Sequence, residues 1–266
     1  MKIGKREFNK TGDTYIWGIL NLTPDSFSDG GQFQNQEDAL RHVEQMIIEG
    51  ADIIDVGGES TRPGYRLLSE EEEIDRIAPV IESLKSHFDI PISLDTYKAK
   101  VAKAGILAGA DLINDIWGLK YDKHMAALIA EYNIPCCLMH NRENPVYSDF
   151  MSEVKSDLKE SVEIALKAGI KKENIILDPG VGFAKTYEQN LEVIKRVEEL
   201  HELGYPLLMA ASRKSVIGNA LNLPVSDRLE GTLAISAFAV WKGCSFVRVH
   251  DVKENARLIQ MAKLIK

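Results

Sequence analysis

The sequence IWGILNLTPDSFSDGG, residues 16–31, begins as a buried β-strand and then abruptly becomes polar. Residues 17–22 are apolar except for Asn21, and a run rich in Thr, Pro, Asp, Ser and Gly follows at once. Nearly continuous apolar runs are typical of strands covered on both faces, whereas Pro, Asp and Gly favour loops. The stretch therefore predicts a core strand that ends in an asparagine and continues into a long loop.

The same pattern recurs along the whole chain. Apolar runs of strand length that end in polar residues lie at 14–23, 51–58, 90–96, 110–118, 134–140, 174–180, 205–212 and 244–251. Helical periodicity occupies the intervals. After the first strand the apolar face of the expected helix consists of Ala39, Leu40, Val43, Met46 and Ile47, and the helix ends at Gly50. After the sixth strand the apolar face consists of Leu191, Ile194, Val197, Leu200 and Leu203, and the helix ends at Gly204. A last helix begins near Asp251 and carries Ala256, Ile259 and Ala262.

Eight strand–helix units in about 250 residues predict an α/β fold, a single-domain (β/α)₈ TIM barrel over residues 1–266. A doubly wound open sheet is the second interpretation. That fold usually has fewer strands and carries a glycine-rich fingerprint after the first one. No linker, repeat or low-complexity segment divides the sequence.

Composition narrows the classes of function. A net charge of −8 argues against nucleic acid as a partner, because phosphate backbones select basic surfaces. The first residues contain no apolar core of signal-peptide length, and no run approaches the roughly 20 residues of a membrane span. Three cysteines, of which Cys136 and Cys137 are adjacent in an apolar run, form neither a disulfide framework nor a zinc site. We therefore expect a cytoplasmic protein that does not act at a membrane.

Each predicted strand ends in residues that could form a site. In a barrel these ends converge on one face, where active sites are built. The residues are Asn21; Asp55 and Glu59; Asp95; Asn114 and Asp115; His140; Asp178; Ser212, Arg213 and Lys214; Arg248 and His250. Taken singly, Asp95 and Asp115 could be helix N-caps or turn formers, and Asp178-Pro179-Gly180 could be only a turn. Taken together, they predict a polar site.

Sorting these residues by chemistry indicates the kind of ligand. Asp95, Asn114 and Asp178 can hydrogen-bond the N–H and C=O edge of a flat heterocycle. The cations Arg62, Arg213, Lys214 and Arg248, with His250, suit an anion, and the loops after strands seven and eight are the usual phosphate corner of barrels. Alternation with Val247 and Val249 predicts that Arg248 and His250 face the interior, where a charge needs a partner. Together they suit a polar ring with a phosphorylated tail.

Seven motifs then resemble those of the bacterial dihydropteroate synthase family. They are GILNLTPDSFSDGG, DVGGESTRPG, SLDTYKAKVA, LINDIWG, ILDPGVGFAKT, ASRKSVIG and VRVHDV, and they extend from the first strand to the last. The resemblance implies a pterin-binding barrel that condenses p-aminobenzoate with 6-hydroxymethyl-7,8-dihydropterin diphosphate, releasing diphosphate and forming dihydropteroate in folate synthesis. It also implies sulfonamide inhibitors, which mimic p-aminobenzoate, and a homodimer.

The resemblance also assigns roles to residues. It implies that the pterin is bound by Asp95, Asn114, Met139, Asp178, Gly182 and Lys214. It implies that the diphosphate is bound by Asn21, Thr61, Arg248 and His250, with Asn21 as a Mg²⁺ ligand. The p-aminobenzoate end corresponds to Phe27, Thr61, Arg62, Pro63, Phe183 and Ser212.

The implied mechanism needs no covalent enzyme intermediate. Mg²⁺, Arg248 and His250 would neutralise the departing diphosphate. Asp95 would stabilise positive charge on the ring, and the arylamine would then attack. The expected catalytic residues are thus Asp95, Lys214, Arg248 and His250. The segment TPDSFSDGG would act as a lid, against the alternative of an inert surface loop.

The same residues are also compatible with three other functions. A Schiff-base aldolase would use Lys214, which has Arg213 beside it. A related pterin barrel that passes a methyl group to a corrinoid protein would have no diphosphate for Arg62, Arg248 and His250 to bind. A binding module would bind the pterin diphosphate without turnover. For the dimer, Ala234, Ile235, Ala237, Phe238 and Val240 could supply the surface or could equally pack on the barrel.

Overall fold

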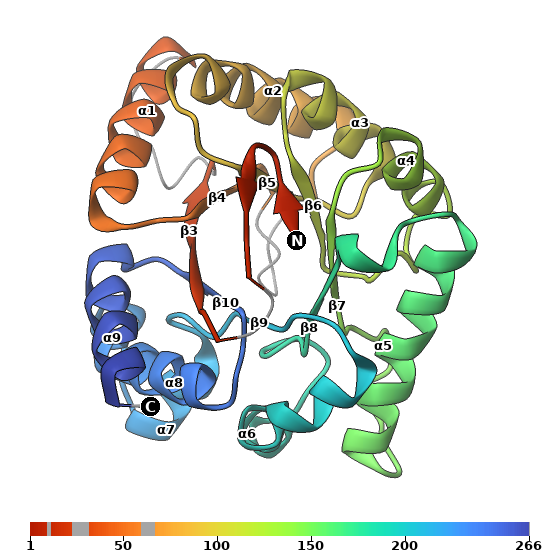
Figure 1. Ribbon diagram of the computed structural model, residues 1–266, viewed down its shortest axis with the longest axis vertical. Coiled ribbons are helices and arrows are strands. Elements are labelled where there is room, and N and C mark those ends of the chain that lie inside the picture. Colours follow the sequence, from red (N-terminus) through yellow and green to blue (C-terminus); the bar gives the residue numbers. More distant parts are fainter. Residues whose placement is uncertain (10–11, 23–31, 60–66, 266) are drawn as a thin grey trace.

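The computed structural model describes residues 1–9, 12–22, 32–59 and 67–265, and within them the chain forms a (β/α)₈ barrel (Figure 1). Eight strands form one parallel sheet in the order β8-β7-β6-β5-β4-β3-β10-β9. A parallel bridge between Leu177 and Leu207 joins the last two edges and closes the ring. The predicted fold class is confirmed. Each barrel strand lies inside its predicted range: β3 Tyr15–Asn21, β4 Ile53–Gly57, β5 Ile92–Asp95, β6 Leu112–Asp115, β7 Cys136–Met139, β8 Ile175–Asp178, β9 Leu208–Met209 and β10 Phe246–Val249.

Helices surround the barrel, as Figure 1 shows. They are α1 Gln32–Glu49, α2 Glu70–His87, α3 Ala99–Ala108, α4 Met125–Tyr132, α5 Phe150–Lys167, α6 Tyr187–Lys195, α7 Ser215–Leu221, α8 Leu229–Trp241 and α9 Val252–Ile265, with short 3₁₀ helices η2 Lys172–Asn174, η3 Val197–Leu203 and η4 Val225–Asp227. Across the described ranges, none of these helices combines the length and apolar character needed to cross a membrane.

Two helical predictions need correction or refinement. The helix expected after strand six is not continuous: α6 ends at Lys195, and Val197–Leu203 continues as 3₁₀ helix. Within α6 the buried residues are Asn190, Val193 and Ile194, so Leu191, which was expected on the apolar face, is 43% exposed. In α8 the buried residues are Thr232, Ser236, Ala239 and Val240, whereas Ala234 is exposed to solvent.

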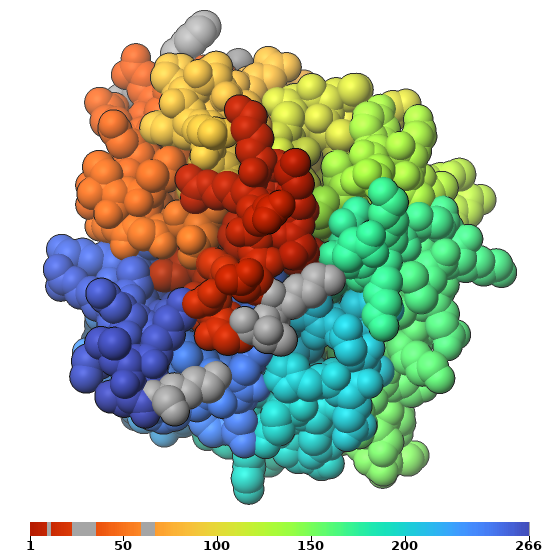
Figure 2. All heavy atoms as spheres, viewed as in Figure 1, coloured from red at the N-terminus to blue at the C-terminus, as the bar shows by residue number. Residues whose placement is uncertain are grey.

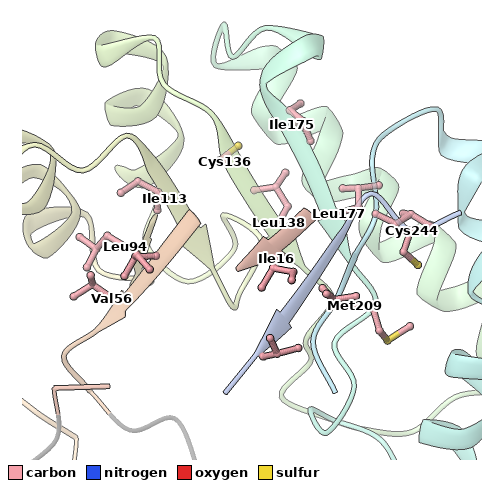
Figure 3. Close-up of a cluster of buried hydrophobic side chains, with 14 of the residues drawn as sticks. Ile16, Val56, Leu94, Ile113, Cys136, Leu138, Ile175, Leu177, Met209 and Cys244 are labelled. Atoms are coloured by element: carbon pink, nitrogen blue, oxygen red, sulfur yellow. The ribbon is translucent and has the colours of Figure 1, made fainter. Parts of the chain in front are cut away.

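Strand residues alternate between two apolar layers. Outward side chains pack under the helices; among them Ile16, Val56, Leu94, Ile113, Leu138 and Leu177 are labelled in Figure 3. Inward side chains fill the barrel's amino-terminal half: Trp17, Ile53, Leu112, Cys137, Ile176, Leu208 and Phe246. Because the interior is packed at this end, polar inward residues are left to the carboxyl end, where the site lies.

An amino-terminal hairpin that the sequence analysis did not identify closes the packed end. Strands β1 Lys2–Ile3 and β2 Arg6–Glu7 pair antiparallel, and Ile3 and Phe8 bury their side chains against the inner layer. Figure 2 shows this part of the chain, in dark red, over the centre of the face that is viewed. The hairpin thereby keeps water from one end of the barrel, so ligands reach the interior from the opposite end.

Candidate functional site

At the centre of the barrel's carboxyl end, Arg248 forms ion pairs with two carboxylates. Its Nε lies 2.5 Å from Oδ2 of Asp55 and its Nη2 lies 2.7 Å from Oδ2 of Asp95. Asp55 is fully buried and also accepts hydrogen bonds from Ser93 Oγ at 2.5 Å and Asn114 Nδ2 at 3.4 Å. The interior position predicted for Arg248 is therefore confirmed, together with its need for a counter-ion.

Asp95 has one carboxylate oxygen that is buried without a partner. Among the described residues, Oδ1 receives no hydrogen bond, although Oδ2 is held by Arg248. Burial, reinforced by the neighbouring Asp55, raises the pKa of Asp95 to about 7 against the lowering effect of Arg248. A buried acceptor without a partner costs free energy, so it marks a place where a ligand's N–H donor is stabilising.

Asp178 and Lys214 form a second polar group at this end of the barrel. Asp178 Oδ1 accepts from the N–H of Gly180 at 2.7 Å, and burial raises the pKa of this carboxyl. Lys214 Nζ donates to Val181 O at 2.5 Å and lies 4.9 Å from the ring centroid of Phe183. Burial lowers the pKa of Lys214 to about 8 despite the attraction of Asp178. Lys214 is therefore a donor within the pocket and not a solvated surface charge.

An apolar cluster lies on the same end of the barrel. Tyr97, Ile116 and Met139 are buried together, with Trp117 and Phe183 packed against them. Met139 and Asp178 are paired in register on β7 and β8, so an apolar and an acidic side chain stand side by side. This combination of an apolar wall with a few fixed polar groups is typical of small-molecule sites and suits a flat, polar ring.

The end of β10 meets the segment after β9 through Ser212 and His250. Ser212 Oγ lies 3.0 Å from His250 Nδ1 and accepts from the His250 N–H at 3.2 Å. Arg213, which the sequence grouped with the anion-binding cations, instead pairs with Asp251, with Nε 3.0 Å from Oδ2. Arg213 and Arg248, which the sequence analysis grouped as cations for an anion, therefore both have carboxylate partners within the protein.

Asn21 and Asp95 lie on either side of β4 at the carboxyl end of the barrel. The two residues flank Gly57, since a Cβ placed on Gly57 would be 3.6 Å from Asn21 Oδ1 and 3.8 Å from Asp95 Cβ. In the described part of the chain, no three His, Cys, Asp or Glu residues form a metal-binding group. A single neutral oxygen fits Mg²⁺ that arrives with a phosphorylated ligand, because this ion keeps water and phosphate oxygens in its coordination sphere.

Glu59, another predicted strand-end residue, belongs to a buried ion-pair cluster. Its Oε2 lies 2.7 Å from Lys98 Nζ, which also lies 2.8 Å from Glu73 Oε2. Leu68 N–H donates to Glu59, and the carbonyl of Leu68 accepts from Lys98. The cluster therefore connects the end of β4 with the start of α2. The predicted residues Phe27, Thr61, Arg62 and Pro63 lie outside the described residues.

Asp115 acts as a turn former and not as a residue of the polar site. Its carboxylate accepts hydrogen bonds from the N–H groups of Trp117 and Leu119, both at 2.8 Å, and thereby stabilises a turn. Asn114 is next to it on β6, but alternation directs Asn114 inward, to Asp55. The side chain of His140 contacts Asp157 and Lys185, while its backbone N–H donates to the Asp178 carbonyl.

Sequence reasoning named Asp55 as a strand end but gave it no role in the site. The signal that could have identified it is its position between Ile54 and Val56, which makes it an inward carboxylate on an otherwise apolar strand. Such a residue requires a buried cation. Arg248 was the only cation that the strand alternation also placed inside, so the pair could have been predicted.

Fold and site together define a barrel with a polar, ligand-sized site at the carboxyl ends of its strands. The family model described as pterin binding enzyme matches residues 17–250. The dihydropteroate synthase of Clostridium beijerinckii is 61% identical over 266 residues, covering 100% of this chain and 99% of that protein. The chain therefore belongs to the pterin-binding enzyme family, and within it to the dihydropteroate synthases.

Solved structures agree with this assignment. A Clostridium difficile dihydropteroate synthase, determined in the presence of pteroic acid, has a TM-score of 0.93 and 50% identity, covering 100% of this chain and 98% of that one. A Yersinia pestis dihydropteroate synthase in a sulfonamide drug complex has a TM-score of 0.92 and 39% identity, covering 100% and 98%. A Xanthomonas albilineans dihydropteroate synthase with 4-aminobenzoic acid has a TM-score of 0.91 and 38% identity, covering 95% and 93%.

Proposed function

We propose that this protein transfers the pterin-methyl group of 6-hydroxymethyl-7,8-dihydropterin diphosphate to p-aminobenzoate, forming 7,8-dihydropteroate for folate synthesis. The bond between the CH₂ carbon and the diphosphate oxygen breaks, and the bonding electrons leave with diphosphate. A bond from the arylamine nitrogen to the same carbon forms, and the nitrogen loses a proton. The ligands in the Clostridium and Xanthomonas structures, pteroic acid and 4-aminobenzoic acid, support this reaction.

The observation that carries the proposal is the unpartnered Oδ1 of Asp95 among the described residues. In one pocket, Asp95 and Asp178 offer acceptors, Asn114 offers both kinds of group, and Lys214 offers a donor. This is the complement of the donor and acceptor edge of a pterin ring. Met139 and Gly182 would line the faces and edges of that ring, with Met139 buried at the pocket wall.

Asp95 has a second role in the proposed reaction. As the C–O bond breaks, positive charge develops on the CH₂ carbon and is delocalised into the ring. A carboxylate held in place within a largely dry pocket stabilises that charge more strongly than water would. Arg248 keeps Asp95 in position, and its pairing with Asp95 favours the ionised form of the carboxyl.

The diphosphate would lie toward His250 and Asn21, with Arg248 beneath it. Mg²⁺ bound at Asn21 would supply positive charge that neutralises the leaving diphosphate. Because Arg248 is already paired with two carboxylates, its attraction for diphosphate is weaker than that of an unpaired cation, and its larger contribution is to hold Asp95. Thr61 is a further proposed diphosphate ligand and lies outside the described residues.

The p-aminobenzoate end would be formed by Phe183 and Ser212 on the described side of the pocket. Phe183 presents its ring to Lys214, and Ser212 is fixed by His250. Phe27, Thr61, Arg62 and Pro63 are proposed to complete this end. A sulfonamide that mimics p-aminobenzoate would occupy the same place, as the Yersinia complex supports.

The test is diphosphate release from the pterin diphosphate in the presence of Mg²⁺, with and without p-aminobenzoate. We expect release that rises with p-aminobenzoate and yields dihydropteroate, and inhibition of that release by a sulfonamide. Pterin binding without any release would overturn the proposed reaction and leave a binding module or a methyl-transfer relative.

We propose a homodimer as the assembled form. Trp241, which ends α8, is 51% exposed, and Leu221 at the end of α7 is 50% exposed. These large apolar side chains lie on adjacent helices and would be covered in a dimer. Sedimentation equilibrium would show a mass near twice 29.7 kDa if the proposal is correct, and the mass of one chain if it is wrong.

A further inference from the structure

His140 directly follows β7, and its backbone N–H donates to the carbonyl oxygen of Asp178 at 2.9 Å, while its side chain points to other partners. Its side chain has no exposed surface, and its Nε2 lies 3.1 Å from Oδ2 of Asp157 in α5. Its other ring nitrogen, Nδ1, lies 2.8 Å from Nζ of Lys185. His140 therefore bridges an outer helix and the loop that follows β8.

The partners of His140 determine which nitrogen carries the proton. The Asp157 carboxylate, whose pKa lies below its ordinary value, can only accept, so the neutral ring carries its proton on Nε2 and donates it to Asp157. Nδ1 then accepts from Lys185, whose pKa burial lowers to about 7. Arg142 holds both oxygens of Asp157: its Nε lies 2.5 Å from Oδ2, the oxygen that His140 also contacts, and its Nη2 lies 3.2 Å from Oδ1. The ion pair between Arg142 and Asp157 thus fixes the His140 ring, and the ring presents a directed acceptor to Lys185.

Lys185 connects this arrangement to the loop between β8 and α6. Besides His140, its ammonium donates to the carbonyl oxygens of Gly180 at 3.0 Å and of Phe183 at 3.1 Å. The two carbonyls lie on either side of Gly182. Gly180 has a φ of +71°, and a Cβ there would be only 2.0 Å from the carbonyl oxygen of His140. The loop is therefore packed directly on the end of β7.

Other contacts hold the loop independently of Lys185. Asn190 accepts from the Gly182 N–H at 2.6 Å, and the Tyr147 hydroxyl donates to the Ala184 carbonyl at 2.7 Å. On the pocket side, Lys214 donates to the Val181 carbonyl. Removing the Lys185 ammonium would accordingly loosen the segment 180–183 without detaching it, and would leave the pocket's polar groups in place.

We propose that Lys185, oriented by His140, is a positioning residue that fixes the segment 180–183 and thereby the substrate-facing surface of Gly182 and Phe183. The inference rests on the proposed function for what Gly182 and Phe183 contact, the pterin and p-aminobenzoate. It does not require Lys185 to touch either substrate.

Amide hydrogen exchange in Lys185→Met tests whether Lys185 fixes the segment 180–183. The substitution keeps an unbranched side chain and removes the hydrogen-bond donor. The Phe183 N–H donates to the Gly180 carbonyl at 3.1 Å, and the Gly182 N–H donates to Asn190, so both amides report on the segment. We expect their exchange to be about tenfold faster than in the unaltered protein. Unchanged exchange would overturn the proposal, whatever reaction the protein catalyses.

Kinetics test the functional consequence. We expect Lys185→Met to raise KM for p-aminobenzoate about tenfold and to change kcat by less than about threefold, because binding is loosened while the charged groups stay in place. A fall in kcat with KM unchanged would overturn the positioning role. Inactive unaltered protein would defeat the proposed function and not this inference, which the exchange measurement still decides. Lys195→Met, on the exposed face of α6, is the matched control.

Two substitutions of His140 distinguish the contribution of Nδ1 from that of Nε2. Asn places a polar atom near the position of Nδ1, and Gln places one near the position of Nε2. We expect His140→Asn to keep the acceptor for Lys185 and to retain a KM near that of the unaltered protein. His140→Gln should reproduce the KM of Lys185→Met. Equal KM values for two folded variants, checked by thermal unfolding, would overturn the part assigned to His140.

Discussion

Arg248 holds Asp95 through only one of its two carboxylate oxygens: Nη2 lies 2.7 Å from Oδ2, while Oδ1 is buried and has no partner among the residues described. The carboxylate is thus fixed in position but not satisfied. A residue in this state is arranged for a ligand, because the cost of the unpaired oxygen is recovered when a donor binds.

Asp95→Asn tests this relationship. The amide has the shape of the carboxylate but not its charge, so in the proposed reaction the positive charge that develops in the ring would lose its partner. We expect kcat to fall about 10²–10³-fold, while the dissociation constant of the pterin diphosphate rises less than about tenfold. Steady-state kinetics and calorimetric titration measure the two effects. Equal losses in both would assign Asp95 to binding alone, and Asp75→Asn on the exposed side of α2 is the control.

Asp55 and Arg248 are predicted to depend on each other for stability. Asp55→Asn removes one of the two carboxylates that pair with Arg248, and Arg248→Met removes the ion-pair partner of both buried carboxylates, so Arg248→Met should lower the free energy of unfolding by about 3–5 kcal/mol and Asp55→Asn by less. The double variant should cost less than the sum of the two. Urea unfolding of the four proteins measures the coupling, and strictly additive losses would show that the pair contributes nothing as a pair.

Lys98→Met should destabilise the protein in a pH-dependent way. Lys98 lies between Glu59 and Glu73, whose side chains are 4% and 2% exposed. Burial raises the pKa of Glu73, whereas for Glu59 the hydrogen bonds of Lys98 and Tyr97 outweigh burial and hold the pKa below its ordinary value. Without the lysine both carboxyls favour the protonated form. We expect a loss of about 3–5 kcal/mol at pH 7 that becomes smaller at pH 5. A loss that is constant with pH would contradict the prediction.

His140 makes the protein less stable in acid. Burial lowers the pKa of His140 from 6.5 to about 4. Between these values the unfolded chain binds a proton that the native chain does not, so stability falls as pH decreases from 6.5 to 4, by about 3 kcal/mol in total. Hydrogen bonds from His140 and Arg142 lower the pKa of Asp157 despite its burial, so its own contribution is lost only at more acidic pH. Chemical denaturation at several pH values measures the slope, and His140→Asn should flatten it.

In the proposed pterin site, Lys214 should set a pH limit on the alkaline side. Burial lowers the pKa of Lys214 to about 8, so above that pH the protein loses the ammonium that we propose donates to the pterin. We expect the affinity for the pterin diphosphate to fall with pH above 8, approaching tenfold per pH unit. Calorimetric titration from pH 7 to pH 9.5 measures this dependence. Lys214→Met should bind more weakly but with little change over this range; a parallel decline in both proteins would assign the effect to another group.

The sequence by itself determined the fold class and the residues at the mouth of the barrel. Eight apolar runs with helical intervals have few other solutions in a chain of this length, and period-2 alternation alone directed Arg248 inward between Val247 and Val249. The same alternation explains why Asn114 and Asp115, although adjacent, have different roles.

Only the tertiary structure decided how these residues are paired. Asp55 and Arg248 are 193 positions apart, and no local pattern states that their side chains meet at 2.5 Å. Arg213 and Arg248 are equally basic in the sequence, yet one is held by Asp251 and the other by Asp55 and Asp95, because pairing depends on which strand ends converge. The amino-terminal hairpin and the contact between His140 and Lys185 were hidden for the same reason: two-residue strands and long-range hydrogen bonds leave no periodic signal. Local periodicity fixes elements and their faces, whereas the closure of the barrel brings distant charges together, and the cost of burying them unpaired selects their partners.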